Sequence, residues 1–291
     1  MKREEAVQLA SRISDLLRSE YVFPDVADQI SALVSRNAES GFYDSKSDPV
    51  GLARILTTDI QAVNHDKHLE VVPTIRSRRD TSPEQVERRL KLMREHNFGF
   101  KTIEILEPRV GYLEIEALID TVFDGAGEAA VAAMNKLASA THLIFDMREN
   151  AGGETSMVQL LSSYLFSGEP LHLNSFRYRK EDFIKQFWTL PFVPGERKPE
   201  TPVFVLINKA TFSGAEAFAY NLQAMGRATI VGETSAGGAN PGDFLPLTEK
   251  LDIFIPVARA MNPITNTNWE GVGVIPDIEC APSEAMQIAI D

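Results

Sequence analysis

The spacing of apolar residues changes once along the chain, near residue 65. Before that point, apolar positions recur three and four residues apart, which predicts amphipathic helices. Asp48 and Pro49 have the residue types of an N-cap and a first helical turn, and so mark the start of a third helix. We therefore expect a small helical bundle over residues 1–64. The three apolar stripes are Ala6, Leu9, Ala10, Ile13, Leu16 and Leu17; Ala27, Ile30, Leu33 and Val34; and Leu52, Leu56, Ile60 and Val63.

Beyond residue 65, short strand-like runs alternate with helical patterns. Strands are predicted at 69–75 and in KTIEIL, VGYLEIE, HLIFDM, PVFVLI and ATIVG. Helices are predicted from the capping box at Ser82 to about His96, and over 127–140, 155–166 and 213–225. Such alternation is typical of an α/β (α+β) core with parallel strands and crossover helices. We expect one core domain over residues 65–291, with a strand-rich edge beyond residue 242.

Charge and composition exclude several classes of function. The 291 residues include 29 basic and 41 acidic side chains, a net charge of −12, which repels nucleic acid and anionic lipid. The cluster of Arg76, Arg78 and Arg79 is interpreted as a solvated loop. The longest apolar run, Ala129 to Met134, has six residues, too few to span a bilayer.

Cys280 is the single cysteine, which excludes an internal disulfide and a thiolate zinc site of this chain alone. We interpret it as a small apolar residue within a strand. The first residues lack the apolar stretch of a signal peptide, so the expected compartment is the cytoplasm unless a leader has been removed.

Ser213 stands at the start of a predicted helix that directly follows the apolar strand PVFVLI. This places its hydroxyl at the carboxyl end of a strand, where α/β sheets bind ligands and where free helix amides stabilise anions. Two interpretations remain open at this point. Ser213 is a nucleophile, or it forms a simple capping box with Glu216. A GxSxG elbow is absent, which excludes an α/β-hydrolase.

Gly152 and Gly153 follow another strand, HLIFDM, and allow the backbone to approach a bound group closely. The alternative explanation is a tight strand-to-helix turn that an ion pair of Asp146 and Arg148 shapes. Of the five histidines, His65 and His68 lie at the transition between the two regions. The others, His96, His142 and His172, are interpreted as structural.

Six segments together resemble the C-terminal processing (tail-specific) serine peptidase family, which includes the tricorn core and interphotoreceptor retinoid-binding protein. They occur in the family's order over residues 64–280, and the N-terminal helices are similar to those of the retinoid-binding-protein branch. The resemblance implies a ClpP/crotonase-like core. The matching segments are DKHL (66–69), VGYLEI (110–115), DMRENAGG (146–153), TFSGAEAFA (211–219), GRATIVGETSAGG (226–238) and NWEGVGVIPDIE (268–279).

The resemblance also implies roles for individual residues. Ser213 would be the nucleophile, His68 its general base and Glu270 the acid that supports the base. The Gly214 amide would be one oxyanion donor, and Gly152 or Gly153 would supply a second. The lysine base of the bacterial processing branch falls where this chain has Gly238, so a Ser-Lys dyad is not expected; Lys209 is the alternative base to test.

Two features depart from the family pattern. Lys67 occupies the place of a serine that, in tricorn-like members, links the histidine to the acid. About 40 residues separate His68 from VGYLEI, which is too few for the PDZ domain of processing peptidases, so no PDZ insertion is expected.

The predicted function is therefore a serine peptidase that acts on peptides or unstructured polypeptide through a Ser-His acyl-enzyme mechanism, without metal or cofactor. The alternative is a non-catalytic binder of retinoids or fatty acids, and an esterase would use the same acyl chemistry. Self-association is left open.

Overall fold

Three helices form where the apolar stripes predict them, in a computed structural model that describes residues 1–44, 48–74, 80–180 and 182–291. They are α1 (Arg3–Glu20), α2 (Pro24–Ser40) and α3 (Pro49–Gln61). The carboxylate of Asp48 accepts a hydrogen bond from the Gly51 amide at 2.7 Å, so Asp48 is the predicted N-cap of α3. The predicted helical region is confirmed.

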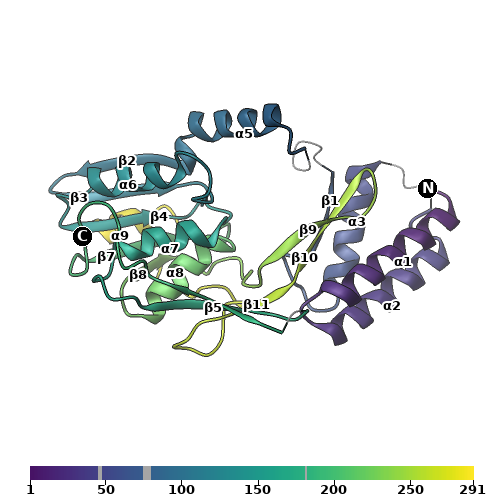
Figure 1. The fold of residues 1–291 in the computed structure, drawn as a ribbon. Helices are drawn as coiled ribbons and strands as arrows, with labels where there is room; N and C mark the ends of the chain where they lie inside the picture. The colour runs from purple at the N-terminus through teal and green to yellow at the C-terminus, as the bar shows by residue number, and fades with distance from the viewer. Residues whose placement is uncertain (45–47, 75–79, 181) are drawn as a thin grey trace. The chain divides into compact units, whose positions relative to one another are not determined.

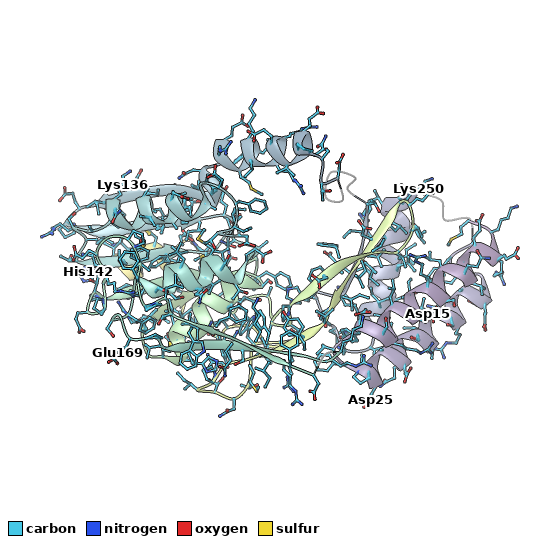
Figure 2. All side chains as sticks on the ribbon, in the orientation of Figure 1. Asp15, Asp25, Lys136, His142, Glu169 and Lys250 are labelled. Atoms are coloured by element: carbon cyan, nitrogen blue, oxygen red, sulfur yellow. The ribbon has the colours of Figure 1, made fainter. Side chains whose placement is uncertain are left out.

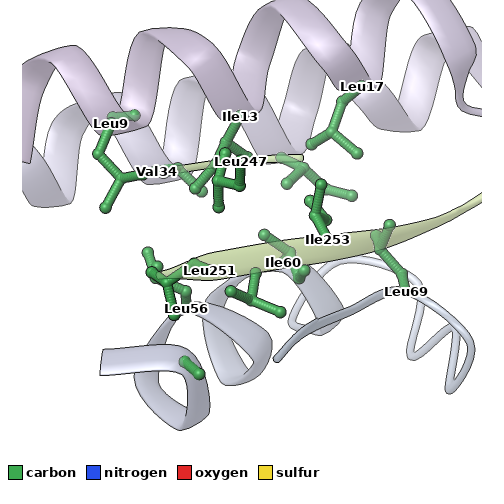
Figure 3. Packing of buried hydrophobic residues seen from close by; sticks show 14 of the residues in the cluster. Leu9, Ile13, Leu17, Val34, Leu56, Ile60, Leu69, Leu247, Leu251 and Ile253 are labelled. Carbon is green, nitrogen blue, oxygen red and sulfur yellow. The ribbon is translucent and has the colours of Figure 1, made fainter. Parts of the chain in front are cut away.

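A three-stranded antiparallel sheet packs with these helices. Its order is β1 (Glu70–Pro73), β10 (Leu251–Pro256) and β9 (Gly242–Pro246). Figure 3 shows that one apolar core joins helices and strands, because Leu9, Ile13 and Leu17 lie over Leu251 and Ile253. Of the strands predicted beyond residue 242, β9 and β10 therefore form one sheet with β1 and cover the helices instead of extending the core sheet.

The chain forms two compact units, and each unit consists of three separate segments of the sequence. The first consists of Met1–Arg79, Phe176–Lys185 and Asn240–Ala260, and the second of Asp80–Ser175, Gln186–Ala239 and Met261–Asp291. The first unit thus takes in strands from distant parts of the sequence. The division of the chain at residues 64 and 65 stays a prediction.

The second unit is built on a six-stranded sheet of order β12-β8-β7-β4-β3-β2. All neighbouring strands are parallel except β2 and β3, which form an antiparallel pair. This confirms the predicted α/β class with a mostly parallel sheet. The strands are β2 (Phe100–Leu106), β3 (Val110–Ile115), β4 (His142–Asp146), β7 (Val203–Ile207), β8 (Thr229–Gly232) and β12 (Ile278–Glu279).

Helices cover both faces of this sheet (Figure 1). On one face, Phe145 of β4 meets Phe218 of α8 (Gly214–Ala224), with ring centroids 5.1 Å apart. Helices α6 (Ala126–Lys136) and α7 (Thr155–Ser163) lie on the same side as α8. On the other face, Ile144 and Leu206 pack with α9 (Ala285–Ile290), a short C-terminal helix that the sequence analysis did not predict.

The remaining elements lie outside the two sheets described above. Helix α5 (Pro83–Glu95) has Ser82 as its N-cap, as predicted, and a short 3-10 helix, η1 (Asn97–Gly99), leads into β2. Strands β5 (His172–Tyr178), β6 (Ile184–Trp188) and β11 (Ala258–Met261) form a third sheet of order β11-β5-β6. In the described parts of the chain, no helix combines the length and apolarity that a bilayer crossing requires. The basic cluster Arg76, Arg78 and Arg79 lies outside the described residues.

Candidate active site

Ser213 precedes helix α8 and is held in an unusual backbone conformation. Its φ and ψ are 52° and −117°, a region that residues with a side chain rarely adopt. Such a conformation costs on the order of 1–3 kcal/mol and persists only where neighbouring contacts enforce it. Neighbouring contacts therefore hold Ser213 in this conformation.

The first of these contacts comes from Glu216, one turn further along α8. Its carboxylate accepts a hydrogen bond from the Ser213 amide at 2.8 Å. A hydrogen bond to a charged acceptor contributes about 1.5–3 kcal/mol, which is enough to offset strain of the size expected at Ser213. The Glu216 half of the predicted capping box is thus present, and it fixes the backbone of the candidate nucleophile.

Glu216 is fully buried and has further donors around it. Its Oε1 accepts from Ser235 Oγ and the Gly237 amide, both at 2.6 Å, and its Oε2 accepts from the Gly238 amide at 2.9 Å as well as from Ser213. Burial raises the pKa of Glu216, and these four hydrogen bonds oppose that shift.

The predicted glycine turn lies directly against Ser213. A Cβ atom on Gly152 would lie 2.7 Å from Ser213 Cβ and 2.8 Å from the Gly214 nitrogen. A Cβ on Gly214 would in turn lie 2.6 Å from the Gly153 carbonyl oxygen. Gly152 and Gly153 also have positive φ angles of 107° and 137°, which favour glycine. The structure therefore brings Gly152, Gly153, Ser213 and Gly214 together at the carboxyl ends of β4 and β7.

Asn150 accepts a hydrogen bond from one amide of this turn, which is then not available to a ligand. It is fully buried, its Oδ1 accepts from the Gly152 amide at 2.7 Å, and its backbone carbonyl accepts from the Phe212 amide at 3.1 Å. Within the described part of the chain, by contrast, the amides of Gly153 and Gly214 donate to no protein acceptor. These two N–H groups are thus the ones left to bind an anion beside Ser213.

Glu270 is joined to the same network from another loop. Its Oε2 accepts from the Ala239 amide at 2.7 Å. The adjacent Trp269 is buried, and its indole N–H donates to the Gly238 carbonyl at 2.8 Å. The loop 235–239 is therefore hydrogen-bonded both to Glu216 and to the segment 269–270. Through this loop, a chain of hydrogen bonds connects the backbone of Ser213 with the carboxylate of Glu270.

His68 belongs to the first unit, where its surroundings are equally specific. The Asp66 side chain accepts from the His68 amide at 3.0 Å, and the Tyr21 hydroxyl donates to Asp66 at 2.8 Å. The imidazole stacks on Phe254 of β10, with ring centroids 5.7 Å apart. Burial lowers the pKa of His68 to about 4, so the ring is neutral at pH 7 and able to accept a proton.

The other candidates from the sequence have plainer environments. Lys209 is 80% exposed and forms an ion pair with Glu233 at 2.7 Å, which raises its pKa and makes it a poor base. Asp146 and Arg148 form the predicted ion pair, with Oδ2 and Nη2 2.5 Å apart. Figure 2 shows His142 at the surface of the second unit, at the amino end of β4.

Comparison with known proteins identifies the family. A family model described as "Peptidase family S41" matches residues 109–280, which is more than half of the chain. The chain belongs to this family. A second model, described as the N-terminal domain of Peptidase_S41 in eukaryotic IRBP, matches residues 2–102. Both matches confirm the resemblance to C-terminal processing serine peptidases of the retinoid-binding-protein branch.

Individual relatives and solved structures agree with this family membership. A carboxy-terminal-processing protease of Bartonella bacilliformis is 28% identical over 176 residues, which are 60% of this chain and 39% of that protein. The chain thus spans less than two-fifths of the length of the curated relatives it first matches. The crystal structure of mature CPAF has the same fold, with a TM-score of 0.67 at 13% identity over 97% of this chain and 94% of that one. The tricorn protease has a TM-score of 0.58 at 13% identity, over 98% of this chain and 35% of that one.

Three residues of this S41 chain stand out in the structure although the sequence analysis gave them no role in a site. Glu216 was considered only as a capping partner, and the SxxE spacing indicates nothing beyond that. Asn150 lies in a motif dominated by its glycines, and its buried side chain has no sequence signal. Asp66 could have been found, because an Asp two residues before His68 has the spacing of an Asx turn.

Proposed function

We propose that this S41 chain is a serine peptidase, with Ser213 as its nucleophile. The observation that carries the proposal is the strained Ser213 at the start of α8, beside the amides of Gly153 and Gly214. Strain at one residue that also adjoins an anion site is typical of a catalytic nucleophile, whereas a helix cap requires neither.

The chemistry follows from these groups. Ser213 Oγ attacks the carbonyl carbon of a peptide bond, and His68 accepts the hydroxyl proton, since its ring is neutral at pH 7. The negative charge that develops on the carbonyl oxygen is stabilised by the N–H groups of Gly153 and Gly214. His68 then protonates the leaving amine, and water hydrolyses the acyl-Ser213 ester. Glu270 stabilises the imidazolium form of His68.

The choice of Gly153 over Gly152 as the second oxyanion donor rests on Asn150. A donor that is already bonded to Asn150 Oδ1 cannot bind the oxyanion without losing that bond. The proposed substrate is peptide or unstructured polypeptide, in agreement with the relatives, which are carboxy-terminal-processing proteases.

A fluorophosphonate probe tests the nucleophile. We expect the native protein to be labelled on Ser213, as located by peptide mass mapping, and Ser213→Ala to remain unlabelled. Equal labelling of both proteins would exclude Ser213. If neither is labelled and retinol quenches the fluorescence of Trp188 or Trp269 with micromolar affinity, the chain is a binder and the peptidase proposal fails.

The same preparation separates a peptidase from an esterase. We expect the native protein to cleave an unstructured polypeptide as well as an activated ester, with both activities lost in Ser213→Ala. Cleavage of the ester alone would support the esterase.

A further inference from the structure

Glu216 is the buried carboxylate that connects the candidate nucleophile to the loop 235–239. It lies at the third position of α8, and its side chain is fully buried. A carboxylate buried to this degree is expensive unless it is hydrogen-bonded on both oxygens. Both oxygens of Glu216 accept two donors each, so its hydrogen-bonding capacity is filled.

The identity of the donors indicates what Glu216 does. Three of the four are backbone amides, from Ser213, Gly237 and Gly238, and the fourth is the Ser235 hydroxyl. Ser235 in turn accepts from the Val274 amide at 2.7 Å, so the arrangement extends to the segment that follows Glu270. A helix cap alone needs one of these bonds. The other three serve to fix a loop against the start of α8.

We propose that Glu216 is a positioning residue of the reaction, which holds Ser213 in its left-handed conformation and fixes the loop that carries the Glu270 contact. It takes no part in bond making. The inference rests on the proposed function, since positioning matters only if Ser213 reacts. It adds a requirement for an ionised carboxylate at a position where the SxxE spacing indicates only a helix cap.

Glu216→Gln provides a test that keeps the volume of the side chain. The amide NH₂ takes the place of one oxygen, and in either orientation it faces at least one backbone N–H, from Gly237 or from Ser213 and Gly238. We expect the rate of Ser213 labelling by a fluorophosphonate to fall at least tenfold, while the final stoichiometry, which reports the folded fraction, stays near that of the native protein.

Asp59→Asn is the control. Asp59 is a partly buried carboxylate of the first unit, which accepts hydrogen bonds from the Tyr43 hydroxyl and the Asn37 side-chain amide. We expect this variant to lose thermal stability and to keep a labelling rate within twofold of the native protein. An equal loss of rate in both variants would mean that Glu216 is merely structural, and would overturn the proposal.

Amide hydrogen exchange gives a readout that does not depend on activity. We expect the Ser213 and Gly238 amides to exchange at least tenfold faster in Glu216→Gln than in the native protein, well below the unfolding temperature. Unchanged exchange overturns the positioning role even if the native protein is labelled. Failure of the native protein to label at Ser213 instead contradicts the proposed function, so the two failures are distinguishable.

Discussion

A Cβ atom at Gly152 would lie 2.7 Å from the Cβ of Ser213, closer than side-chain carbons approach in folded proteins. The neighbouring backbone atoms are equally close, so no flexible side chain can move aside to make room. The turn after β4 and the start of α8 are therefore fitted to each other at the backbone.

Gly152→Ala should abolish this fit. The added methyl group meets Ser213 and Gly214, and the φ of +107° adds strain for any side chain. We expect labelling of Ser213 to slow by on the order of a hundredfold or more, because a displacement near 1 Å in a catalytic site has effects of that order.

Gly127→Ala is the control for that substitution. Gly127 lies inside α6, and a Cβ there has open space within 4 Å. We expect a gain in stability of about 0.5–1 kcal/mol, as for other glycine-to-alanine changes in helices, and an unchanged labelling rate. Thermal melts and labelling kinetics of both variants decide the matter, and a slowed rate in Gly127→Ala would contradict the local explanation.

His68 should determine the acidic limb of the profile of kcat/KM against pH. The neutral imidazole is the base, so kcat/KM falls as the pH drops through the pKa of His68, which burial lowers to about 4. We expect half of the activity to remain near pH 4. A limb centred near 6.5, the ordinary value for histidine, would contradict this prediction.

Loss of the base should be severe. His68→Ala is expected to lower kcat/KM for peptide cleavage by on the order of 10³-fold or more, as for other nucleophile-base pairs. Lys209→Met is the comparison, since Lys209 is exposed and paired with Glu233, and its activity should stay within twofold of the native value. If Lys209→Met is the more damaging change, the base has been misassigned.

Burial of a neutral histidine also links stability to pH. As the pH falls, His68 binds a proton near pH 6.5 in the unfolded chain, but only near pH 4 in the folded chain. The contribution of His68 to stability is therefore complete above about pH 6.5 and declines as the pH falls toward 4. Urea titrations at several pH values should show that the free energy of unfolding falls less for His68→Ala than for the native protein between about pH 6.5 and pH 4.

Tyr21→Phe should affect both stability and activity. The Tyr21 hydroxyl donates to Asp66 and accepts from Asn64 at 2.7 Å, and its loss leaves buried groups unsatisfied at a cost of about 1–3 kcal/mol. Because Asp66 holds the His68 amide, we also expect a lower kcat/KM.

Tyr43→Phe separates these two effects. Tyr43 is buried in the same core, and its hydroxyl donates to Asp59 at 2.5 Å. We expect comparable destabilisation in urea, with kcat/KM unchanged. Equal losses of kcat/KM in both variants would show that Tyr21 acts through general stability alone.

Local patterns predicted the elements well. The N-cap at Asp48, the helix from Ser82 and the turn glycines at 152 and 153 all depend on neighbouring residues, which a sequence displays directly. Strand partners are different. The apolar alternation of 251–256 indicates a strand, but its pairing with 70–73 depends on which surfaces the helices leave to be covered.

The same limit applies to the site. Family order identified Ser213, His68 and Glu270, whose roles remain to be tested. The four donors around Glu216 come from two separate segments, and only a folded chain brings them together. The sequence also gives no sign that the Gly152 amide donates to Asn150. For this reason the sequence alone could not decide between Gly152 and Gly153 as the second oxyanion donor.

The pairing of Glu70 with Phe254 has a consequence for how the chain is made. The first three helices leave the ribosome early, yet the strands β9 and β10 that cover their apolar face come only after residue 240. The N-terminal core must therefore wait until synthesis has passed β10, and its leucines and isoleucines stay accessible to chaperones in the meantime. A nascent chain halted before residue 240 should accordingly be sensitive to protease throughout its helical region.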